Sequence, residues 1–532
     1  MIERVLRGGR VWTSGRGDGP PATSVVIQGG RIALVGSDEE ATAMVGPGTE
    51  VIDLQGRWVI PGFVDAHTHF IDGGLRLAQV ELRGVGGPQE FQARIAERIK
   101  RSAPGAWITG ANWDEQVWGG PLPHREWIDR VAADHPVFLV RSDLHMGVAN
   151  SLALERAGID EHTADPSGGR IDRDVAGRPT GVVRDLAMAQ VFEAIPAPDS
   201  AALDAALDRA SAHALARGIT QVHDMGQWTH FETYRRAHAV GRLGVRVYSA
   251  VPMNTLPRLA ELVSSEGRGD ERLWWGGAKA FVDGSLGSST AWFREPYAAD
   301  PSTVGLVVTE LDVLRGTIME AERMGLQAIV HAIGDHANDW LLDVYAEVFK
   351  AFGPRDRRFR IEHAQHLSPH APHRFGALDV VASVQPAHLV DDGPWAEARI
   401  GAERVPRAYA FRSLLDGGAA LAFGSDWTVA PLDPLMGLEA AVHRRTRDPA
   451  SREGWVPEQR ISMEEALLAY TRGAAYAGFS EGWSGQLVSG ACADMAVLSG
   501  ELFEENDGAG GRPAVDLTLL DGRVVFERRR GA

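Results

Sequence analysis

The chain has 532 residues, of which 44% are hydrophobic and 23% charged, so it is long enough to bury a large core or several domains. Its formal net charge of −17 argues against nucleic acid as a partner, because a phosphate-binding surface needs an excess of lysine and arginine. Cys492 is the only cysteine, which excludes a disulfide within the chain and a cysteine-based zinc site.

The N-terminus and the hydropathy of the chain indicate a cytoplasmic protein. Residues 1–7 mix charged and apolar side chains and lack the apolar run of a signal peptide. Nowhere do about eighteen apolar residues run together, as a membrane-spanning helix requires. We therefore expect a cytoplasmic location and no membrane partner.

Both ends of the chain are typical of β-structure. Short β-branched or aromatic runs predict strands at residues 11–13, 25–27, 32–35, 494–498, 515–520 and 524–526. Gly29-Gly30 and Asp521-Gly522 predict tight turns within these two groups. Because chain termini often lie close together, we predict one β-sandwich domain from residues 1–58 and 484–532. Two unrelated β-caps are the alternative.

The middle of the chain alternates apolar strands with helical stretches, which predicts a parallel sheet of βα units. Eight candidate strands occupy residues 59–67, 219–225, 245–251, 277–283, 327–333, 360–364, 380–385 and 421–426. Eight units favour an α/β fold of the (β/α)8 TIM-type barrel class over residues 59–483. An open doubly wound sheet is the alternative, but no glycine fingerprint for a dinucleotide follows any strand.

Two segments exceed what simple connections need. About 150 residues separate the first two barrel strands, so we expect an inserted subdomain at about residues 72–210. A shorter excess, residues 284–309, is rich in glycine, serine, proline and aromatic residues, which predicts an active-site loop or lid.

His67 and His69 end the first barrel strand. Side chains alternate along a strand, so both imidazoles point to the same face and could bind one metal ion. A His-x-His pair is by itself a weak signal, because surface and core histidines give the same pattern. The C-terminal end of a barrel strand, where active sites of this fold are built, favours ligation.

Lys279 lies inside the apolar fourth strand, where a buried ammonium is costly without a partner. An ion pair with Asp283, or an edge position that reaches solvent, would explain the residue by itself. A third interpretation is a carbamate, formed from the neutral amine and carbon dioxide, that bridges two metal ions as a carboxylate does.

Three further strand ends carry residues of the metal-ligand type. His331 ends the fifth strand, His363 the sixth and Asp426 the eighth. A lone aspartate at a strand end is commonly a helix cap. Ligand-type residues at the ends of strands one, four, five, six and eight together predict a metal site.

These residues stand in motifs that resemble the amidohydrolase superfamily, and more narrowly its family 3 branch, which includes N-substituted formamide deformylases. The motifs are Pro61-Gly62-Phe63-Val64-Asp65-Ala66-His67-Thr68-His69, Lys279-Ala280-Phe281-Val282-Asp283-Gly284-Ser285, Val330-His331-Ala332-Ile333-Gly334-Asp335, Arg360-Ile361-Glu362-His363-Ala364-Gln365 and Gly424-Ser425-Asp426-Trp427. The likeness covers nearly the whole chain. Asp143-Leu144-His145 and Gly334-Asp335-His336 depart from the usual Asp-Gly-His and Gly-Asp-Arg of the family.

The resemblance implies a binuclear metal centre in a (β/α)8 barrel. It places His67 and His69 on one ion, His331 and His363 on the second, and a carboxylated Lys279 between them. Asp426 would bind the first ion and act as the catalytic proton shuttle. Imidazole and carboxylate suit several divalent metals, and Zn²⁺, one or two ions per chain, is the default expectation.

The resemblance also implies hydrolysis of an amide-like C–N bond, of the N-substituted formamide or N-acyl type, by hydroxide formed at the metal. A deaminase, a cyclic amide or ester hydrolase, and a non-catalytic barrel homologue are the alternatives. We expect a small-molecule substrate and, since dimers are common, a homodimer. Residues expected to contact the substrate are Asn112, Trp113, Asp143, His145, Asp283, Asp335 and His388.

Overall fold

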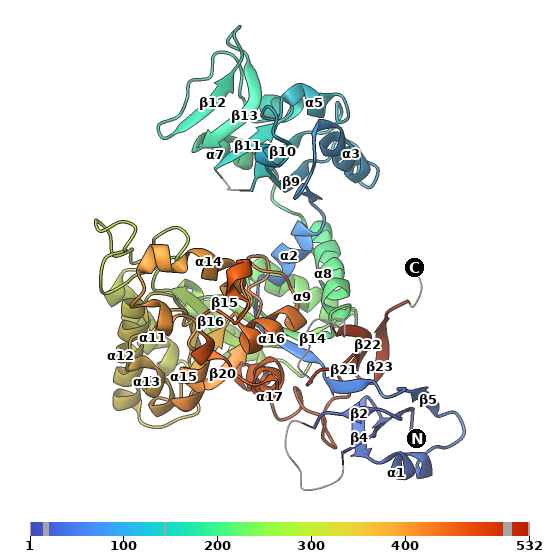
Figure 1. The fold of residues 1–532 in the computed structure, drawn as a ribbon. Helices are drawn as coiled ribbons and strands as arrows, with labels where there is room; N and C mark the ends of the chain where they lie inside the picture. Colours follow the sequence, from blue (N-terminus) through green and yellow to red (C-terminus); the bar gives the residue numbers. More distant parts are fainter. Residues whose placement is uncertain (1, 14–20, 143–144, 504–512, 530–532) are drawn as a thin grey trace. The chain divides into compact units, whose positions relative to one another are not determined.

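The chain is described here from a computed structural model, over residues 2–13, 21–142, 145–503 and 513–529. It divides into two compact units (Figure 1), one of residues 1–73 and 207–532 and the other of residues 74–206. Asp143, one of the expected substrate residues, lies outside the described ranges. Within these ranges, no helix is long and apolar enough to cross a membrane.

Eight parallel strands form the barrel of the first unit, and neighbours in the sheet follow the chain order from β7 to β20. The strands are β7 (Phe63–Thr68), β14 (Ile219–Met225), β15 (Arg246–Pro252), β16 (Leu273–Phe281), β17 (Gln327–Ala332), β18 (Arg360–His363), β19 (Val381–Val384) and β20 (Ala420–Phe423). An isolated parallel bridge between Thr68 and Trp427 brings the two edge strands together at their C-terminal ends. The carboxyl ends of all eight strands therefore meet at one mouth.

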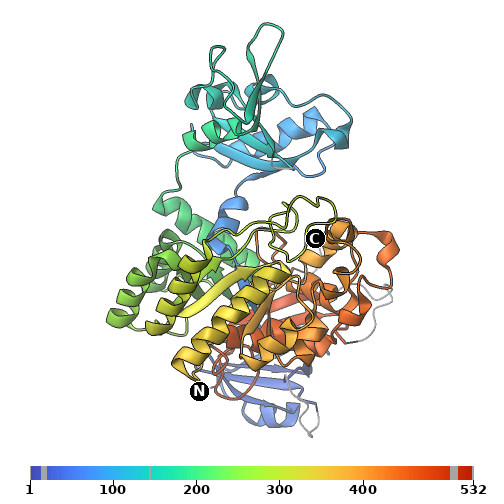
Figure 2. The ribbon, with the colours of Figure 1, turned by 90° about the vertical axis from the view of Figure 1, so that its left-hand side faces the viewer.

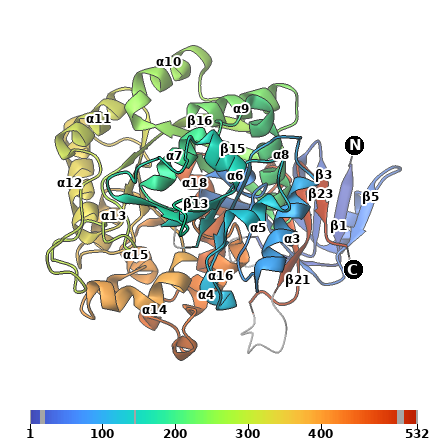
Figure 3. The same ribbon diagram turned by 90° about the horizontal axis from the view of Figure 1, so that it is seen from above.

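Helices cover the outside of the barrel sheet (Figure 3). They are α9 (Trp228–Ala239), α10 (Leu256–Glu266), α11 (Leu311–Arg323), α12 (Asp335–Phe352), α13 (Ala371–Ala377), α14 (His388–Ile400), α15 (Phe411–Asp416), α16 (Pro434–His443), α17 (Met463–Leu468) and α18 (Ala474–Ala477). Figure 2 shows α11 and α12, in yellow, side by side against the strands. In both helices the side that packs on the strands is apolar, for example Ile318 of α11 and Leu341 of α12.

The prediction of one barrel strand over residues 59–67 is wrong in one respect, because this segment forms two separate strands. β6 (Trp58–Pro61) pairs with a C-terminal strand of the terminal domain, and only β7, from Phe63 on, belongs to the barrel. Gly62 separates them at a close approach, since a Cβ atom at this position would lie 2.2 Å from the hydroxyl of Thr220. The glycine lets the chain pass from one sheet to the other at this crowded point.

The two ends of the chain build one β-domain from two sheets. One sheet contains β4 (Arg31–Gly36), β3 (Ser24–Gln28), β1 (Arg4–Arg7) and β5 (Glu50–Asp53). The other contains β2 (Arg10–Val11), β6, β21 (Met495–Ser499), β22 (Ala514–Leu520) and β23 (Arg523–Glu527). Leu6, Val25, Val497 and Leu519 share one buried core, which excludes two unrelated caps.

The second unit is built on a six-stranded sheet. In spatial order its strands are β12 (Gly169–Arg173), β13 (Pro179–Asp185), β11 (Met146–Ala149), β10 (Val137–Arg141), β9 (Ile108–Trp113) and β8 (Val80–Glu81). Its helices are α3 (Pro88–Ile99), α4 (Glu115–Trp118), α5 (Arg125–Asp129), α6 (Ser151–Arg156) and α7 (Ala187–Ala194). Two apolar clusters, around Leu139 and around Phe138, line its two faces. The predicted fold class, a barrel with a terminal β-domain and an inserted subdomain, is confirmed.

Because the terminal domain takes its core from both ends of the chain, we expect it to depend on single C-terminal side chains. Leu519 is fully buried in that core, so Leu519→Ala should lower the free energy of unfolding by about 2–5 kcal/mol. Val525→Ala, on the same sheet but at a side chain 40% exposed, is the control and should change it by less than about 0.5 kcal/mol. Urea unfolding followed by circular dichroism measures both, and equal losses would contradict the shared core.

Candidate metal centre

Side chains at the C-terminal end of the barrel converge on the carboxylate of Asp426. The Nε2 atoms of His67 and His69 lie 3.5 Å and 3.4 Å from its Oδ1 atom. The Nε2 atom of His388, at the start of α14, lies 3.9 Å from Oδ2. His67, His69 and Asp426 form one group with metal-ligand spacing, and His363, His388 and Asp426 form a second. Asp426 is common to both groups.

The imidazole rings of four predicted ligands are neighbours. The ring centroids of His331 and His363 are 4.4 Å apart, those of His67 and His363 are 5.2 Å apart, and those of His67 and His69 are 5.8 Å apart. Strands β7, β17 and β18 thus bring together residues that are far apart in the sequence. The predicted ligands His67, His69, His331, His363 and Asp426 lie in one place.

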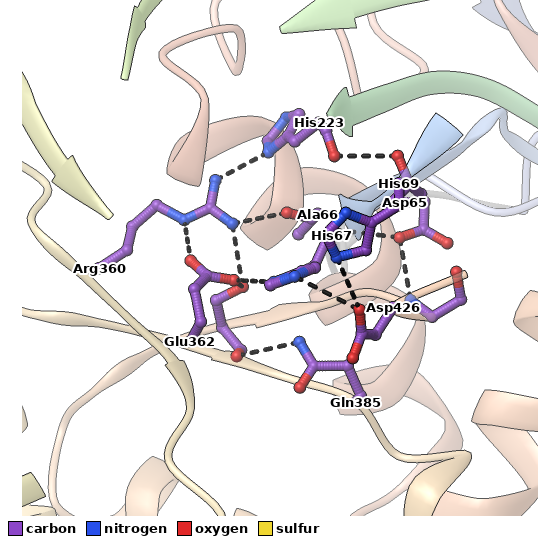
Figure 4. A network of polar contacts seen from close by, with 12 residues as sticks. Asp65, Ala66, His67, His69, His223, Arg360, Glu362, Gln385 and Asp426 are labelled. Atoms are coloured by element: carbon purple, nitrogen blue, oxygen red, sulfur yellow. Dashed lines mark hydrogen bonds and ion pairs between the residues drawn. The ribbon is translucent and has the colours of Figure 1, made fainter. Parts of the chain in front are cut away.

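A buried carboxylate fixes the orientation of the His67 ring. Nδ1 of His67 lies 2.5 Å from Oε2 of Glu362, which leaves Nε2 to face Asp426 (Figure 4). Arg360 donates to Oε1 of Glu362 at 2.7 Å, and Ser383 donates to Oε2 at 2.7 Å. Histidine ligands commonly donate their second ring N–H to a carboxylate in this way.

Burial and neighbouring charges set the protonation of this group. Burial lowers the pKa of His67 to about 4 and that of His331 to about 3, so both rings are neutral near pH 7. Burial opposes ionisation of Glu362, but the charge of Arg360, the contact with His67 and the charge of Lys279 together outweigh burial and hold the pKa of Glu362 below its usual range. The result is a set of neutral nitrogen donors beside carboxylates that remain ionised.

Lys279 is almost completely buried in β16. Burial lowers the pKa of its amine to about 8, which favours the neutral form far more than for a lysine in water. Among the described residues no carboxylate lies within 4 Å of its Nζ atom, so the expected ion pair with Asp283 does not form. The position is also not an edge position open to solvent. Both simple explanations of a lysine in this strand are therefore wrong.

Asp283 ties together the backbone at the mouth of the barrel. Its carboxylate accepts hydrogen bonds from the amides of Trp292, Ile333 and Gly334, at 2.8–3.0 Å. Burial raises its pKa to about 7. Nε2 of His331 lies 2.9 Å from the carbonyl oxygen of Gly284, which leaves Nδ1 of His331 for a metal ion. Asp283 thus holds the 284–309 loop and the end of β17 in place around this ligand.

Asp65 performs the same task between β7 and the segment after β20. Its Oδ1 atom accepts from the amides of His67 at 3.1 Å and Ser425 at 2.9 Å. Asp426, which follows Ser425, has a positive φ of +54°, and a second proposed ligand, His363 on β18, has a φ of +75°. Non-glycine residues with positive φ are uncommon and cluster at functional sites, where the surroundings enforce them.

The donor atoms fit a divalent metal ion. Nδ1 of His363 and Nε2 of His388 are buried, and neither has a hydrogen-bond partner in the described part of the chain. Buried polar atoms are normally satisfied, so unpaired imidazole nitrogens that face a carboxylate call for a further ligand. Neutral imidazole nitrogens with carboxylate oxygens suit zinc and other first-row divalent ions.

The other expected substrate residues lie in different surroundings. Trp113 is fully buried in a core of the insertion, and Asn112 donates to Glu81 at 2.9 Å. His145, on the insertion, pairs with Asp185 at 2.9 Å. Asp335 begins α12 and accepts from the amide of Arg294 at 2.9 Å. Of this set, His388 and Asp283 lie among the ligands.

The prediction from sequence missed the residues that support the ligands. Glu362, Arg360 and Asp65 were visible only as parts of motifs, without a role. The sequence signal that could have found them is a charged residue inside an apolar strand. Such a residue is buried, and a buried charge needs a partner. The identity of that partner could not be known, since Glu362 lies 295 positions from His67.

Comparison with known proteins identifies the family. The sequence profile of the amidohydrolase family matches residues 50–526. Protein LONG AFTER FAR-RED 3 of Arabidopsis thaliana is 43% identical over 91% of this chain and 85% of its own length. N-substituted formamide deformylase of Arthrobacter pascens is 29% identical over 95% of each chain. The solved structure of an uncharacterized metal-dependent hydrolase from Pyrococcus horikoshii OT3 matches with a TM-score of 0.79 and 29% identity, over 96% of this chain and 99% of the other.

The profile covers most of the chain and includes every predicted ligand, and the structural relative has the same fold over nearly its whole length. The chain therefore belongs to the amidohydrolase family and is a metal-dependent hydrolase that acts on carbon–nitrogen bonds.

Proposed function

We propose that this enzyme hydrolyses an amide-like bond of a small molecule, of the N-substituted formamide or N-acyl type, at a binuclear zinc centre. The observation that carries the proposal is the convergence of His67, His69, His363 and His388 on both oxygens of Asp426. The similarity to a formamide deformylase over almost the full length of both chains favours this substrate class.

The metal ions would be held by the residues already described. His67 and His69 form one set of nitrogen donors, and His331 and His363 form the other. Lys279, as a carbamate, would supply the oxygen bridge; its amine is buried and has no carboxylate within 4 Å among the described residues, which supports this modification. When bound, the ions supply a water of lowered pKa and polarise the carbonyl of the substrate.

Side chains of the barrel mouth would carry out the proton transfers of the reaction. Asp426 accepts the proton of the attacking water, because its carboxylate is ionised and aims both oxygens at the centre. It then returns the proton to the leaving nitrogen, so that the amine departs neutral. Its strained backbone and the tie of Asp65 to Ser425 hold the carboxylate in place during both transfers. His388 is outside the two sets of metal ligands proposed above; its Nε2 atom, 3.9 Å from Oδ2 of Asp426 and without a hydrogen-bond partner among the described residues, is placed to donate to the substrate oxygen.

Asp426→Asn should lower kcat by about 100- to 10,000-fold, because an amide cannot accept the proton of the attacking water. Metal content, measured by elemental analysis, should stay near that of the native enzyme, since four histidines and Lys279 remain. Asp416→Asn, at an exposed carboxylate at the end of α15, is the matched control and should leave kcat unchanged. Substantial activity in Asp426→Asn would refute the assigned role.

Glu362→Gln should weaken metal binding by about 10- to 100-fold, because the His67 ring loses its ionised acceptor. Competition with a chelator of known affinity measures the change. Ser383→Ala removes only one neutral donor to Glu362 and should have a smaller effect. Unaltered metal affinity in Glu362→Gln, with a folded protein by circular dichroism, would contradict the role of this contact.

Carboxylation of Lys279 can be observed directly. Protein loaded with metal in ¹³C-labelled bicarbonate should show one carbamate carbon signal by NMR. The signal should be absent from Lys279→Arg, whose guanidinium does not form the carbamate, and present in the control Lys350→Arg, at the C-terminal turn of α12. Full metal occupancy without a carbamate signal in the native enzyme would show that Lys279 stays a free amine.

A further inference from the structure

Phe281 is an exposed aromatic side chain among the metal ligands. It ends β16, where the preceding residues from Leu273 to Ala280 are all buried, yet 40% of Phe281 is exposed. Its ring centroid lies 5.3 Å from that of His331 and 4.7 Å from the Nζ atom of Lys279. A phenyl ring thus presents a free surface beside two of the proposed ligands.

The strand geometry directs this surface to the mouth of the barrel. Phe281 follows Lys279 by two positions, so both side chains lie on the same face of β16. Phe281 is also the strand partner of His331 on β17. The next residue, Val282, is held on both sides, because its amide donates to the His331 carbonyl at 2.9 Å and its carbonyl accepts from the Val308 amide at 2.8 Å.

Two polar groups, the imidazole of His331 and the amine of Lys279, lie next to this ring, and 40% of Phe281 remains exposed. Neither polar group covers a phenyl surface as an apolar core does. An exposed aromatic surface in a binding site is stabilised when an apolar part of a ligand covers it. Ligand sites commonly combine a few polar groups that fix orientation with apolar walls of this kind.

We propose that Phe281 determines specificity by packing against an apolar substituent, cyclic or branched, carried by the amide that is cleaved at this centre. This inference rests on the proposed function and narrows its substrate class. It predicts that amides with bulky apolar substituents are preferred over their methyl analogues. The residue acts through contact area, so it changes the discrimination between substrates rather than the chemistry of the bond.

Two pairs of amides test the inference on the metal-loaded enzyme. N-cyclohexylformamide against N-methylformamide places the apolar group on nitrogen, and cyclohexanecarboxamide against acetamide places it on the acyl side. Phe281→Ala should lower kcat/KM for the cyclohexyl member of a cleaved pair by roughly tenfold relative to the methyl member. Phe352→Ala, at another phenylalanine 40% exposed, at the end of α12, should leave the ratio unchanged.

Binding of metal-chelating hydroxamates separates this inference from the proposed reaction. Calorimetry should show that cyclohexanecarbohydroxamate binds the native enzyme more tightly than acetohydroxamate. Phe281→Ala should lose this preference, and Phe281→Leu should keep most of it. If none of the amides is cleaved, the proposed function fails, and the hydroxamates alone decide the role of Phe281.

Two results would overturn the inference. One is a native enzyme with no preference for the apolar hydroxamate. The other is an equal loss for both hydroxamates in Phe281→Ala at unchanged metal content. If Phe281→Ala loses metal, Phe281→Ser replaces it in this comparison, and the same equal loss, or an unchanged preference, in Phe281→Ser would reject the inference.

Discussion

The contact between Glu362 and His67 is the interaction on which the metal centre depends. It joins β18 to β7 across the barrel, and both side chains are removed from solvent. Arg360 neutralises the carboxylate and also donates to the Ala66 carbonyl at 2.5 Å and the Ser383 hydroxyl at 3.0 Å, so one guanidinium reaches three strands. A buried charge is tolerated only when it is paired and hydrogen-bonded in this way. Loss of one partner would leave the others unsatisfied and would release the His67 ring.

Aspartates that bind backbone amides hold the rest of the mouth in position. Asp65 joins β7 to the segment that carries Asp426, and Asp283 joins the 284–309 loop to the end of β17. Asp224, at the end of β14, accepts from the amide of Phe70 at 2.7 Å, directly after His69. Each carboxylate replaces solvent for amides that regular sheet pairing leaves unpaired beyond the strand ends. These contacts fix the backbone on both sides of the proposed ligands.

Periodicity and strand-end chemistry were enough to predict the barrel and to predict that the proposed ligands meet at one end of it. His67, His331 and His363 lie at the C-terminal ends of their strands, and Asp426 follows β20. Parallel strands bring such residues to one edge. Interpretation of single residues was less successful. Considered alone, Lys279 suggested an ion pair with Asp283 or an edge position, but the Asp283 carboxylate instead accepts hydrogen bonds from the amides of Trp292 and Ile333. Trp113, expected to contact the substrate, packs in the core of the insertion, because a tryptophan in a strand is usually buried.

The sequence alone determined the order of the βα units, the alternation that places His67 and His69 on one face, and the residue types able to bind a metal. These are local properties, set by the strand repeat and by side-chain chemistry within a few positions. Only the tertiary structure decided that Glu362 orients His67, that Gly62 separates two sheets, and that Phe281 is exposed beside the ligands. The first two facts depend on contacts between residues far apart in the sequence. The third depends on which parts of the folded chain leave a side chain exposed. A local sequence pattern contains neither kind of information.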